Sequence, residues 1–516
     1  MRILLSGPGT GKTTRIKSLI DSEFRDASRI VVLSFTNFTV QNLDQKFDKY
    51  PNVECWTLHK FALILNPHNG KYILTNGEDK ELAKVARLFE RDEKELYEVL
   101  GCITFEGMIT ECAEYLKTNP AHVGQVLGDV DLLIVDEYQD FNQSEQTIID
   151  ELSKVAKETI ILGDDDQSIY GFKDADPDRI ISIHSDPSVT KIPHEHKCWR
   201  CPDDVVERAG RMIAKNKKRV SKEWSKSGQP GTVTFNQLES ANETDLNIQK
   251  EIVSLKAKEP TCTILILSPF SSITTQLHTS LNDEGLDVNN CFTEKVDIDT
   301  LERIWWMNAI FTDSINPFIV MLLRRVQGAK RDGARTLIRS IIDKGLSREE
   351  IVRQIVAEEL FPAPYRNYLE NEPTLDDFLK DHQDYKVLDE FIDRTRQTVS
   401  IRRIGSSINP PKDLVEGVVN IMSIHKSKGL EADYVFIVGL VKGIVPNDTR
   451  GLDSIEAQRR LLFVAMTRAM KGLFLYSTAE WETSVLKGNM ADMKQFSYKS
   501  KKVCVGRTSG FISEMG

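Results

Sequence analysis

The chain has 516 residues, 40% of them hydrophobic and 28% charged, and a formal net charge of −10 at pH 7. This length suits about three or four domains, and the negative charge argues against a protein that nucleic acid wraps on all sides. No apolar run reaches the ~20 residues that span a bilayer, and the N-terminus meets glycines too early for a signal peptide. We therefore expect an intracellular protein with no membrane contact.

Short apolar segments rich in β-branched residues alternate with helical stretches along the chain. Their hydrophobicity is continuous rather than alternating, which is typical of buried parallel strands. This βαβ pattern predicts an α/β fold. The predicted strands are residues 2–6, 29–35, 131–137 and 159–164, and then 231–235, 262–268, 418–424, 434–440 and 473–477.

Two charged, helical regions break this alternation, and we interpret each as an insertion into an α/β core. The predicted domains are a first core (1–64 and 126–195) with a small helical insertion (65–125), a second core (196–294 and 401–485) with a larger helical insertion (295–400), and a polar, loosely held tail (486–516).

Charge and cysteine spacing distinguish the region at the start of the second core. Residues 211–226 carry seven Lys or Arg against one Glu, which predicts either a solvated helix face or a phosphate contact. Cys198 and Cys201 have the spacing of a zinc-ligand pair, with His194 and His196 just upstream. A structural zinc site usually needs a second, matching pair, and the sequence has none. We therefore interpret the cysteines as reduced thiols.

A phosphate-binding loop follows the first strand. The sequence SGPGTGKTT lies between that strand and a helix. Glycines let backbone N–H groups curve around phosphate oxygens, and the helix N-terminus adds partial positive charge. Lys12 supplies a charge for the β- and γ-phosphates, and Thr13 supplies a hydroxyl for Mg²⁺. The residues predicted to bind nucleotide here are Ser6, Gly7, Pro8, Gly9, Thr10, Gly11, Lys12, Thr13 and Thr14.

Two carboxylates end the apolar strand in LLIVDEYQD. A strand tip beside the phosphate loop is where an acid can hold magnesium, and Asp136 fits that role. Glu137 can then orient or deprotonate the attacking water. A strand that merely reaches solvent does not explain both acids. The sequence therefore predicts hydrolysis of ATP with Mg²⁺ held by Thr13 and Asp136.

The segment LGDDDQSIYGF places three aspartates, a glutamine and two aromatic residues on one loop. Acid clusters usually indicate a metal site or a solvated turn. A calcium-binding loop that starts at Asp164 is excluded by spacing, because Ile169 stands where glycine is required and Ala175 where glutamate is required.

Eight segments resemble the ordered motifs of the UvrD/Rep/PcrA-like superfamily 1 (1A) DNA helicases. DEYQD, GDDDQSIYG, HKSKGLE and VAMTRA are together specific to that family. The resemblance implies two RecA-like P-loop parallel-sheet cores, each with a mostly helical inserted subdomain, and ATP in the cleft between them. The segments are SGPGTGKTT, LSFTN, WTLHK, LLIVDEYQD, LGDDDQSIYGF, HKCWRC, IHKSKGLEADYVFIVGL and RRLLFVAMTRA.

The resemblance also implies roles at the ATP site. Gln167 would sense the γ-phosphate, and Arg200 and Arg468 would reach it from the second core as arginine fingers. Trp199 would stack on adenine, with core packing as the alternative, and Glu431 would contact the ribose. The family's upstream glutamine motif has no counterpart, so adenine selectivity is not implied. The implied catalytic set is Lys12, Asp136, Glu137, Gln167, Arg200 and Arg468.

On the nucleic-acid side, the resemblance implies that aromatic residues of the GDDDQSIYGF loop touch single-stranded DNA, with burial in a core as the alternative. Stacking on aromatic rings tolerates any base sequence, which suits a motor. The positions that match the family's DNA contacts are Phe35, Thr36, Asn37, His59, Tyr170, Phe172 and His425.

The leading interpretation is an ATP-dependent translocase that moves 3′ to 5′ on single-stranded DNA and unwinds duplex at single-strand/double-strand junctions. The alternatives are a DNA-stimulated ATPase that remodels nucleoprotein and a nucleotide-gated sensor subunit of a multiprotein system. The resemblance further implies a cytoplasmic location in a bacterium, or in a bacterial host for a viral protein.

Overall fold

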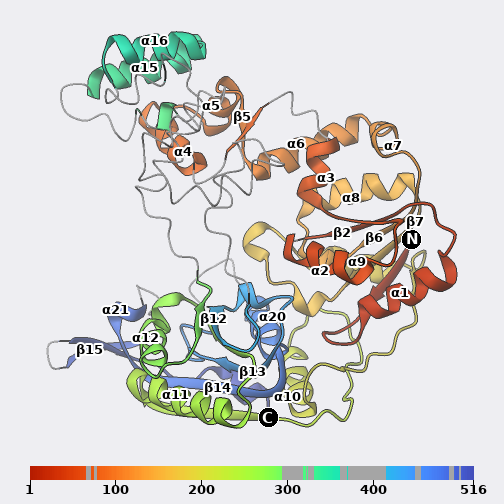
Figure 1. The fold of residues 1–516 in the computed structure, drawn as a ribbon, viewed down its shortest axis with the longest axis vertical. Helices are drawn as coiled ribbons and strands as arrows, with labels where there is room; N and C mark the ends of the chain where they lie inside the picture. Colours follow the sequence, from red (N-terminus) through yellow and green to blue (C-terminus); the bar gives the residue numbers. More distant parts are fainter. Residues whose placement is uncertain are drawn as a thin grey trace. The chain divides into compact units, whose positions relative to one another are not determined.

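The chain divides into two compact units, which we call the core unit and the accessory unit (Figure 1). The core unit comprises Met1–Leu65, Ala113–Phe292 and Lys412–Gly516, and the accessory unit comprises Asn66–Cys112 and Thr293–Pro411. The computed structural model describes residues 1–35, 37–65, 71–74, 78–292, 318–320, 322, 331–360, 369, 414–447, 455–486, 493–498 and 501–516.

The first sheet of the core unit contains only parallel pairings. Its strands are β1 (Arg2–Leu5), β2 (Ile30–Ser34), β3 (Val53–Thr57), β6 (Val130–Val135), β7 (Ala156–Gly163) and β8 (Thr190–Lys191). They are ordered β3-β2-β6-β7-β1-β8. Buried parallel strands require apolar residues on both faces, and β2 is buried at every position. Strands β1, β2, β6 and β7 were predicted; β3 and β8 were missed because polar residues interrupt them.

The second sheet is mixed, and most of its strands are parallel. They are β9 (Thr232–Ser240), β10 (Ile264–Ser268), β11 (Val288–Asn290), β12 (Val419–Ser423), β13 (Ala432–Ile437), β14 (Ala469–Glu482), β15 (Lys494–Tyr498) and β16 (Lys501–Val505). The order is β11-β12-β10-β13-β14-β16-β15, and β9 also pairs with β14 in parallel. Two parallel-strand sheets with helices confirm the predicted α/β fold class.

Helices flank both sheets, and Figure 1 labels most of them. Those near the first sheet are α1 (Lys12–Glu23), α2 (Asn37–Phe47), α3 (Leu58–Leu65), α7 (His122–Leu127), α8 (Gln143–Val155) and α9 (Asp178–Ser185). Those near the second are α10 (Asp203–Ile213), α11 (Ala241–Lys258), α12 (Thr275–Asp283), α20 (Ile455–Met466), α21 (Thr483–Leu486) and α22 (Gly510–Glu514). Among the described residues, no helix is long and apolar enough to cross a membrane.

The described part of the accessory unit is mostly helical. Strands β4 (Tyr72–Ile73) and β5 (Cys102–Ile103) pair in parallel beside helices α4 (Glu78–Leu88) and α5 (Glu93–Val99). The later segment contributes α15 (Arg331–Lys344) and α16 (Arg348–Ala357). Helix α6 (Phe105–Thr118) begins in the accessory unit and ends in the core unit.

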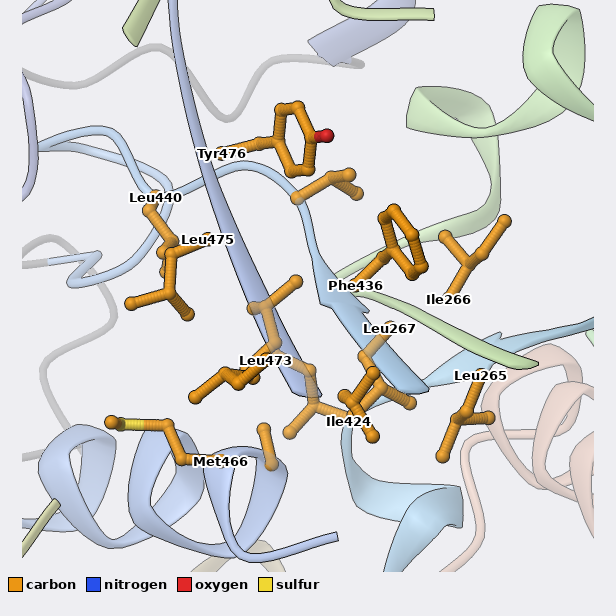
Figure 2. Packing of buried hydrophobic residues seen from close by; sticks show 14 of the residues in the cluster. Leu265, Ile266, Leu267, Ile424, Phe436, Leu440, Met466, Leu473, Leu475 and Tyr476 are labelled. Carbon is orange, nitrogen blue, oxygen red and sulfur yellow. The ribbon is translucent and has the colours of Figure 1, made fainter. Parts of the chain in front are cut away.

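The interior of the second sheet is a continuous apolar cluster, and Figure 2 shows part of it. The rings of Phe436 and Phe474 stack with centroids 4.4 Å apart. Burial of each large apolar side chain contributes about 1.5–3 kcal/mol. This packing therefore fixes the ends of the strands, where the polar residues of the candidate site lie. The labelled side chains include Leu265, Ile266, Leu267, Phe436, Leu473 and Leu475 from the strands and Met466 from the end of α20.

The C-terminal segment is not a loose tail, and that expectation is wrong for its described residues. Strand β16 pairs antiparallel with the end of β14, and β15 extends the sheet by one strand. Beyond them, Phe511 and Met515 of the α22 region are buried in the second core. Polar composition concealed this, because edge strands and a short helix need only a few apolar contacts to be held.

We expect Phe511→Ala to destabilise the core unit by about 3–5 kcal/mol, because a buried aromatic side chain is lost and a cavity remains. Phe511 is only 2% exposed, and the Arg459 guanidinium lies 5.4 Å from its ring centroid. Thermal unfolding measures the effect, with the exposed neighbour substitution Ser513→Ala as control. Equal unfolding midpoints for the two variants would contradict the role assigned to α22.

Candidate functional site

The loop between β1 and α1 has the backbone shape that an anion site needs. Gly9 and Gly11 have φ of +70° and +81°, a region that side chains disfavour. A Cβ on Gly9 would also lie 2.7 Å from the Cβ of Arg200. Gly11 caps α1 without a side-chain hydrogen bond, so the first N–H groups of the helix are available to an anion. This loop therefore fits phosphate.

Ser6 and Gly7, both predicted nucleotide ligands, do not line the cavity in front of the loop. The buried Ser6 hydroxyl lies 2.9 Å from Thr10 Oγ1 and 3.0 Å from a ring nitrogen of His196. The carbonyls of Ser6 and Gly7 accept hydrogen bonds from Lys12 Nζ at 3.0 and 3.3 Å. Ser6, at the first position of the motif, therefore stabilises the loop through Thr10 and His196 without lining the cavity.

A cavity of about 550 Å³ lies in front of this loop. Its walls come from both halves of the core unit, the first half being built on the first sheet and the second half on the second sheet. The six residues of the implied catalytic set all line it. Its lysines and arginines outnumber its carboxylates, which suits a polyanion such as a nucleoside triphosphate. The lining residues are Pro8, Gly9, Thr10, Gly11, Lys12, Thr13, Thr14, Lys17, Thr39, Leu43, Lys46, Asp136, Glu137, Gln167, Trp199, Arg200, Gly429, Glu431, Arg468 and Met470.

The two acids after β6 have opposed environments. Burial and then the neighbouring Glu137 charge raise the pKa of Asp136 to about 7. Burial acts on Glu137 too, but the charges of Lys428 and Lys12 outweigh it and hold the pKa of Glu137 below its usual range. Gln139 Nε2 donates to Glu137 Oε2 at 2.6 Å. With Thr13 on the same cavity, Asp136 provides the oxygen ligands that Mg²⁺ prefers.

Arg468 is a fully buried cation in the turn between α20 and β14. It donates to the carbonyls of Val464 at 2.8 Å and Leu430 at 3.1 Å, and to Gln167 Oε1 at 3.3 Å. Burial and the nearby charge of Arg200 lower the pKa of Arg468 to about 10, so it stays charged at neutral pH. The second-core arginine therefore contacts the first-core glutamine directly.

Arg200 and Trp199 face the cavity from the CWRC segment. Arg200 Nε forms an ion pair with Glu431 at 2.5 Å, so the carboxylate predicted to contact ribose is paired here with the arginine. Trp199 is 52% exposed, which argues against core packing for its ring. Lys197 Nζ lies 4.5 Å from the Trp199 ring centroid.

The two cysteines of CWRC are buried on either side of these residues. The Cys201 backbone N–H donates to Cys198 Sγ at 3.4 Å, and Cys201 Sγ lies 3.5 Å from the Thr467 carbonyl oxygen. The hydrogen bond from the Cys201 thiol, opposed by burial, lowers the pKa of Cys198 to about 6. His196 contacts Ser6, so these contacts favour the thiol interpretation over zinc.

The three aspartates after β7 form ion pairs within the protein. Their carboxylate oxygens lie close enough together to hold a cation, and that cation is the ammonium of Lys222. Lys222 Nζ lies 3.0, 2.6 and 2.7 Å from Asp164, Asp165 and Asp166. Arg219 adds a bidentate pair to Asp166 at 2.9 and 2.7 Å. The basic run 211–226 therefore makes internal ion pairs, not only solvent contacts.

A second buried lysine connects the HKSKGLE segment with the first core. Lys428 Nζ lies 2.6 Å from a carboxylate oxygen of Asp140 and donates to the Gln167 carbonyl at 2.6 Å. Both charged side chains are almost wholly buried. Burial, only partly offset by Lys428, raises the pKa of Asp140 to about 7.

The aromatic residues of the LGDDDQSIYGF loop, Tyr170 and Phe172, form a partly exposed cluster with Phe35 and His425. Phe35 and Tyr170 stack with ring centroids 5.1 Å apart, and Tyr170 lies 5.8 Å from Phe172. Phe172 is 62% exposed and meets the His425 ring edge-on at 5.5 Å. Tyr170 is half-buried between Phe35 and Phe172, so core burial describes part of Tyr170 but not Phe172.

The remaining predicted DNA contacts are His59, Thr36 and Asn37, and the structure describes them only in part. His59 lies in the first turn of α3, and burial and then the charge of Lys173 lower its pKa. Thr36 lies outside the described residues. Asn37 begins α2, and its side chain is outside the described part of the chain.

Sequence reasoning missed Lys222, Arg219, Lys428 and Asp140 as residues of the site. The signal was present, because Lys222 and Arg219 belong to the basic run and the other two lie inside recognised motifs. Their importance comes from pairing between segments far apart in the chain, such as Asp165 and Lys222, which are 57 positions apart.

The sequence is similar to two family models and to several known proteins. The UvrD/REP helicase N-terminal domain family model matches residues 65–188, and the UvrD-like helicase C-terminal domain family model matches residues 373–480. An ATP-dependent DNA helicase PcrA of Leuconostoc citreum is 24% identical over 481 residues, covering 80% of this chain and 62% of the relative. The chain thus spans less than two thirds of that relative.

Other relatives are covered more fully. An ATP-dependent DNA helicase Rep of Buchnera aphidicola subsp. Acyrthosiphon pisum is 26% identical, with 80% of this chain and 72% of the relative aligned. A DNA helicase II of Rickettsia typhi is 23% identical, with 92% of this chain and 89% of the relative aligned. The similarity therefore extends across both cores.

We expect the Cys198 thiol to titrate with a pKa of about 6, well below the usual thiol range, because hydrogen bonds from the Cys201 thiol and backbone N–H stabilise its thiolate. The thiolate's ultraviolet absorbance measures this, as the difference between the unsubstituted chain and Cys198→Ser. Removing the donor in Cys201→Ala should move the midpoint upward. An unmoved midpoint would show that this hydrogen bond does not control the charge of Cys198.

Proposed function

We propose that this chain, which belongs to the UvrD-like superfamily 1 helicases, hydrolyses Mg-ATP and uses the reaction to move along single-stranded DNA and separate duplex. The supporting observation is a single cavity in which Lys12, Gln167 and Arg468 face one another from both halves of the core unit. The 3′ to 5′ direction and the preference for single-strand/double-strand junctions rest on the family resemblance.

The chain's own residues divide the chemistry between them. Lys12 and the loop N–H groups hold the phosphates, and Thr13 and Asp136 hold Mg²⁺, which when bound neutralises charge on the phosphate oxygens. Glu137, kept ionised by nearby lysines, accepts a hydrogen bond or a proton from the attacking water. Arg200 and Arg468 place positive charge where the transferred phosphoryl group gains negative charge, and such arginines accelerate hydrolysis by about 10³–10⁵.

The geometry also supports a coupling of hydrolysis to DNA. Gln167 lies on the same short loop as Tyr170 and Phe172, so a shift of Gln167 toward phosphate moves the aromatic rings. Phe172 meets His425 from the second core, so the faces offered to bases come from both halves of the core unit. Base stacking contributes about 1–3 kcal/mol per base.

Lys12→Ala should reduce ATP turnover by about 10²-fold or more, since it removes the charge that holds the β- and γ-phosphates. Turnover is measured with and without single-stranded DNA, and DNA binding by fluorescence anisotropy should persist. Lys154→Ala, an exposed charge on α8, is the control. Undiminished turnover in Lys12→Ala would refute the assigned phosphate site, and a wild-type chain that no nucleic acid stimulates would favour the sensor alternative.

Phe172→Ala should slow strand displacement while single-stranded DNA still stimulates ATP turnover, because an exposed stacking face is lost without a change in the nucleotide cavity. Displacement of a labelled strand from duplexes with 3′ or 5′ tails measures both the rate and the direction of movement. Phe235→Ala, an exposed ring on β9, serves as the matched control. Unaltered displacement by Phe172→Ala would remove this ring from the DNA path, and displacement only from 5′ tails would reverse the proposed direction.

A further inference from the structure

One segment, residues 216–225, connects the helix that precedes Arg468 with the loop that carries Gln167. We call this segment the strap; it follows α10 and contains the centre of the basic run. At its first end, Asn216 Nδ2 donates to the Glu456 carbonyl at 2.9 Å, and the Lys217 N–H donates to the Glu456 carboxylate at 2.7 Å. Arg460 donates to the Lys218 carbonyl. The strap is thus fastened to α20.

At its second end the strap is fastened to the first core. The Val220 N–H donates to Asp165 Oδ2 at 2.8 Å, and Trp224 Nε1 donates to the Pro8 carbonyl at 3.0 Å. Lys222 is the central attachment, because its ammonium contacts all three aspartates and its side chain is only 5% exposed. Buried charges are stable only when they are paired and hydrogen-bonded, so Lys222 and the aspartates require one another.

Asp164 transmits this arrangement to Gln167. Asp164 Oδ2 accepts a hydrogen bond from Gln167 Nε2 at 2.7 Å, while Asp164 Oδ1 lies 3.0 Å from Lys222 Nζ. A carboxylate can only accept and a guanidinium can only donate. The amide of Gln167 therefore has one compatible orientation: its nitrogen faces Asp164, and its oxygen faces Arg468 at 3.3 Å.

We propose that Lys222 is a positioning residue for ATP hydrolysis, which fixes the amide of Gln167 through Asp164 so that the Gln167 oxygen faces Arg468 in the nucleotide cavity. This inference rests on the proposed function. Lys222 does not line the cavity, so it acts on turnover and not on nucleotide affinity. The strap thereby ties the orientation of the glutamine to the helix that leads into Arg468.

The test uses the full chain and measures steady-state ATP turnover with saturating single-stranded DNA. Lys222→Met should lower kcat by at least about tenfold, with KM for ATP changed by less than about twofold. Lys226→Met, which removes a neighbouring exposed lysine paired with Glu207, should change neither value. Thermal unfolding and titration with a fluorescent ATP analogue report how much of each variant is folded and able to bind.

A double-mutant cycle separates positioning from general support of the fold. In a Gln167→Ala background, Lys222→Met should cause less than about a twofold further loss of kcat, because the amide through which Lys222 acts on the cavity is already absent. Multiplied losses would overturn the inference. Asp164→Asn is the second variant, should Lys222→Met not fold: the asparagine permits either amide orientation, so kcat should fall toward that of Gln167→Ala, and wild-type turnover would overturn the inference.

The outcomes also distinguish the two levels of the argument. A wild-type chain that turns over ATP at the same kcat as Lys222→Met refutes the positioning role alone. A wild-type chain without turnover on any nucleic acid refutes the proposed function, and the positioning role with it.

Discussion

Two buried lysines from the second half of the core unit, Lys222 and Lys428, each meet carboxylates of the first half. A charge removed from water is tolerated only where an opposite charge and hydrogen bonds replace the solvent. Lys222 meets Asp164, Asp165 and Asp166, and Lys428 meets Asp140. These pairs flank Gln167, so the wall of the nucleotide cavity depends on charge matching between segments that are distant in the chain.

The same constraint explains why one loop carries acids, a glutamine and aromatic rings. The aspartates at the base of the loop are neutralised by Lys222 and Arg219. Gln167, in the middle of the loop, lines the cavity, and Phe172, at its tip, is exposed. Gln167, which lines the cavity, and Phe172 are joined by the backbone of one short loop. Under the proposed function, a displacement at the nucleotide would therefore reach the DNA along that backbone.

The fold class and most of the cavity residues could be predicted from the sequence, for physical reasons that differ. Buried parallel strands need continuous apolar runs such as IVVLS, and a phosphate loop needs glycines at positive φ, so both leave local signals. The ion pairs of Lys222 and Lys428 leave none, because a lysine in a basic run looks the same whether its partner is water or a distant aspartate. The C-terminal strands were missed for a related reason: Cys504 and Phe511 are buried by β14 and α20, which lie far upstream of them.

Arg200 and Glu431 are paired on one wall of the cavity. Glu431 accepts only the Nε–H of Arg200, and a guanidinium carries four more N–H donors that can reach another acceptor. Under the proposed function, one nucleotide would therefore engage both partners without separating them, with its phosphates on the arginine and a ribose hydroxyl on the glutamate.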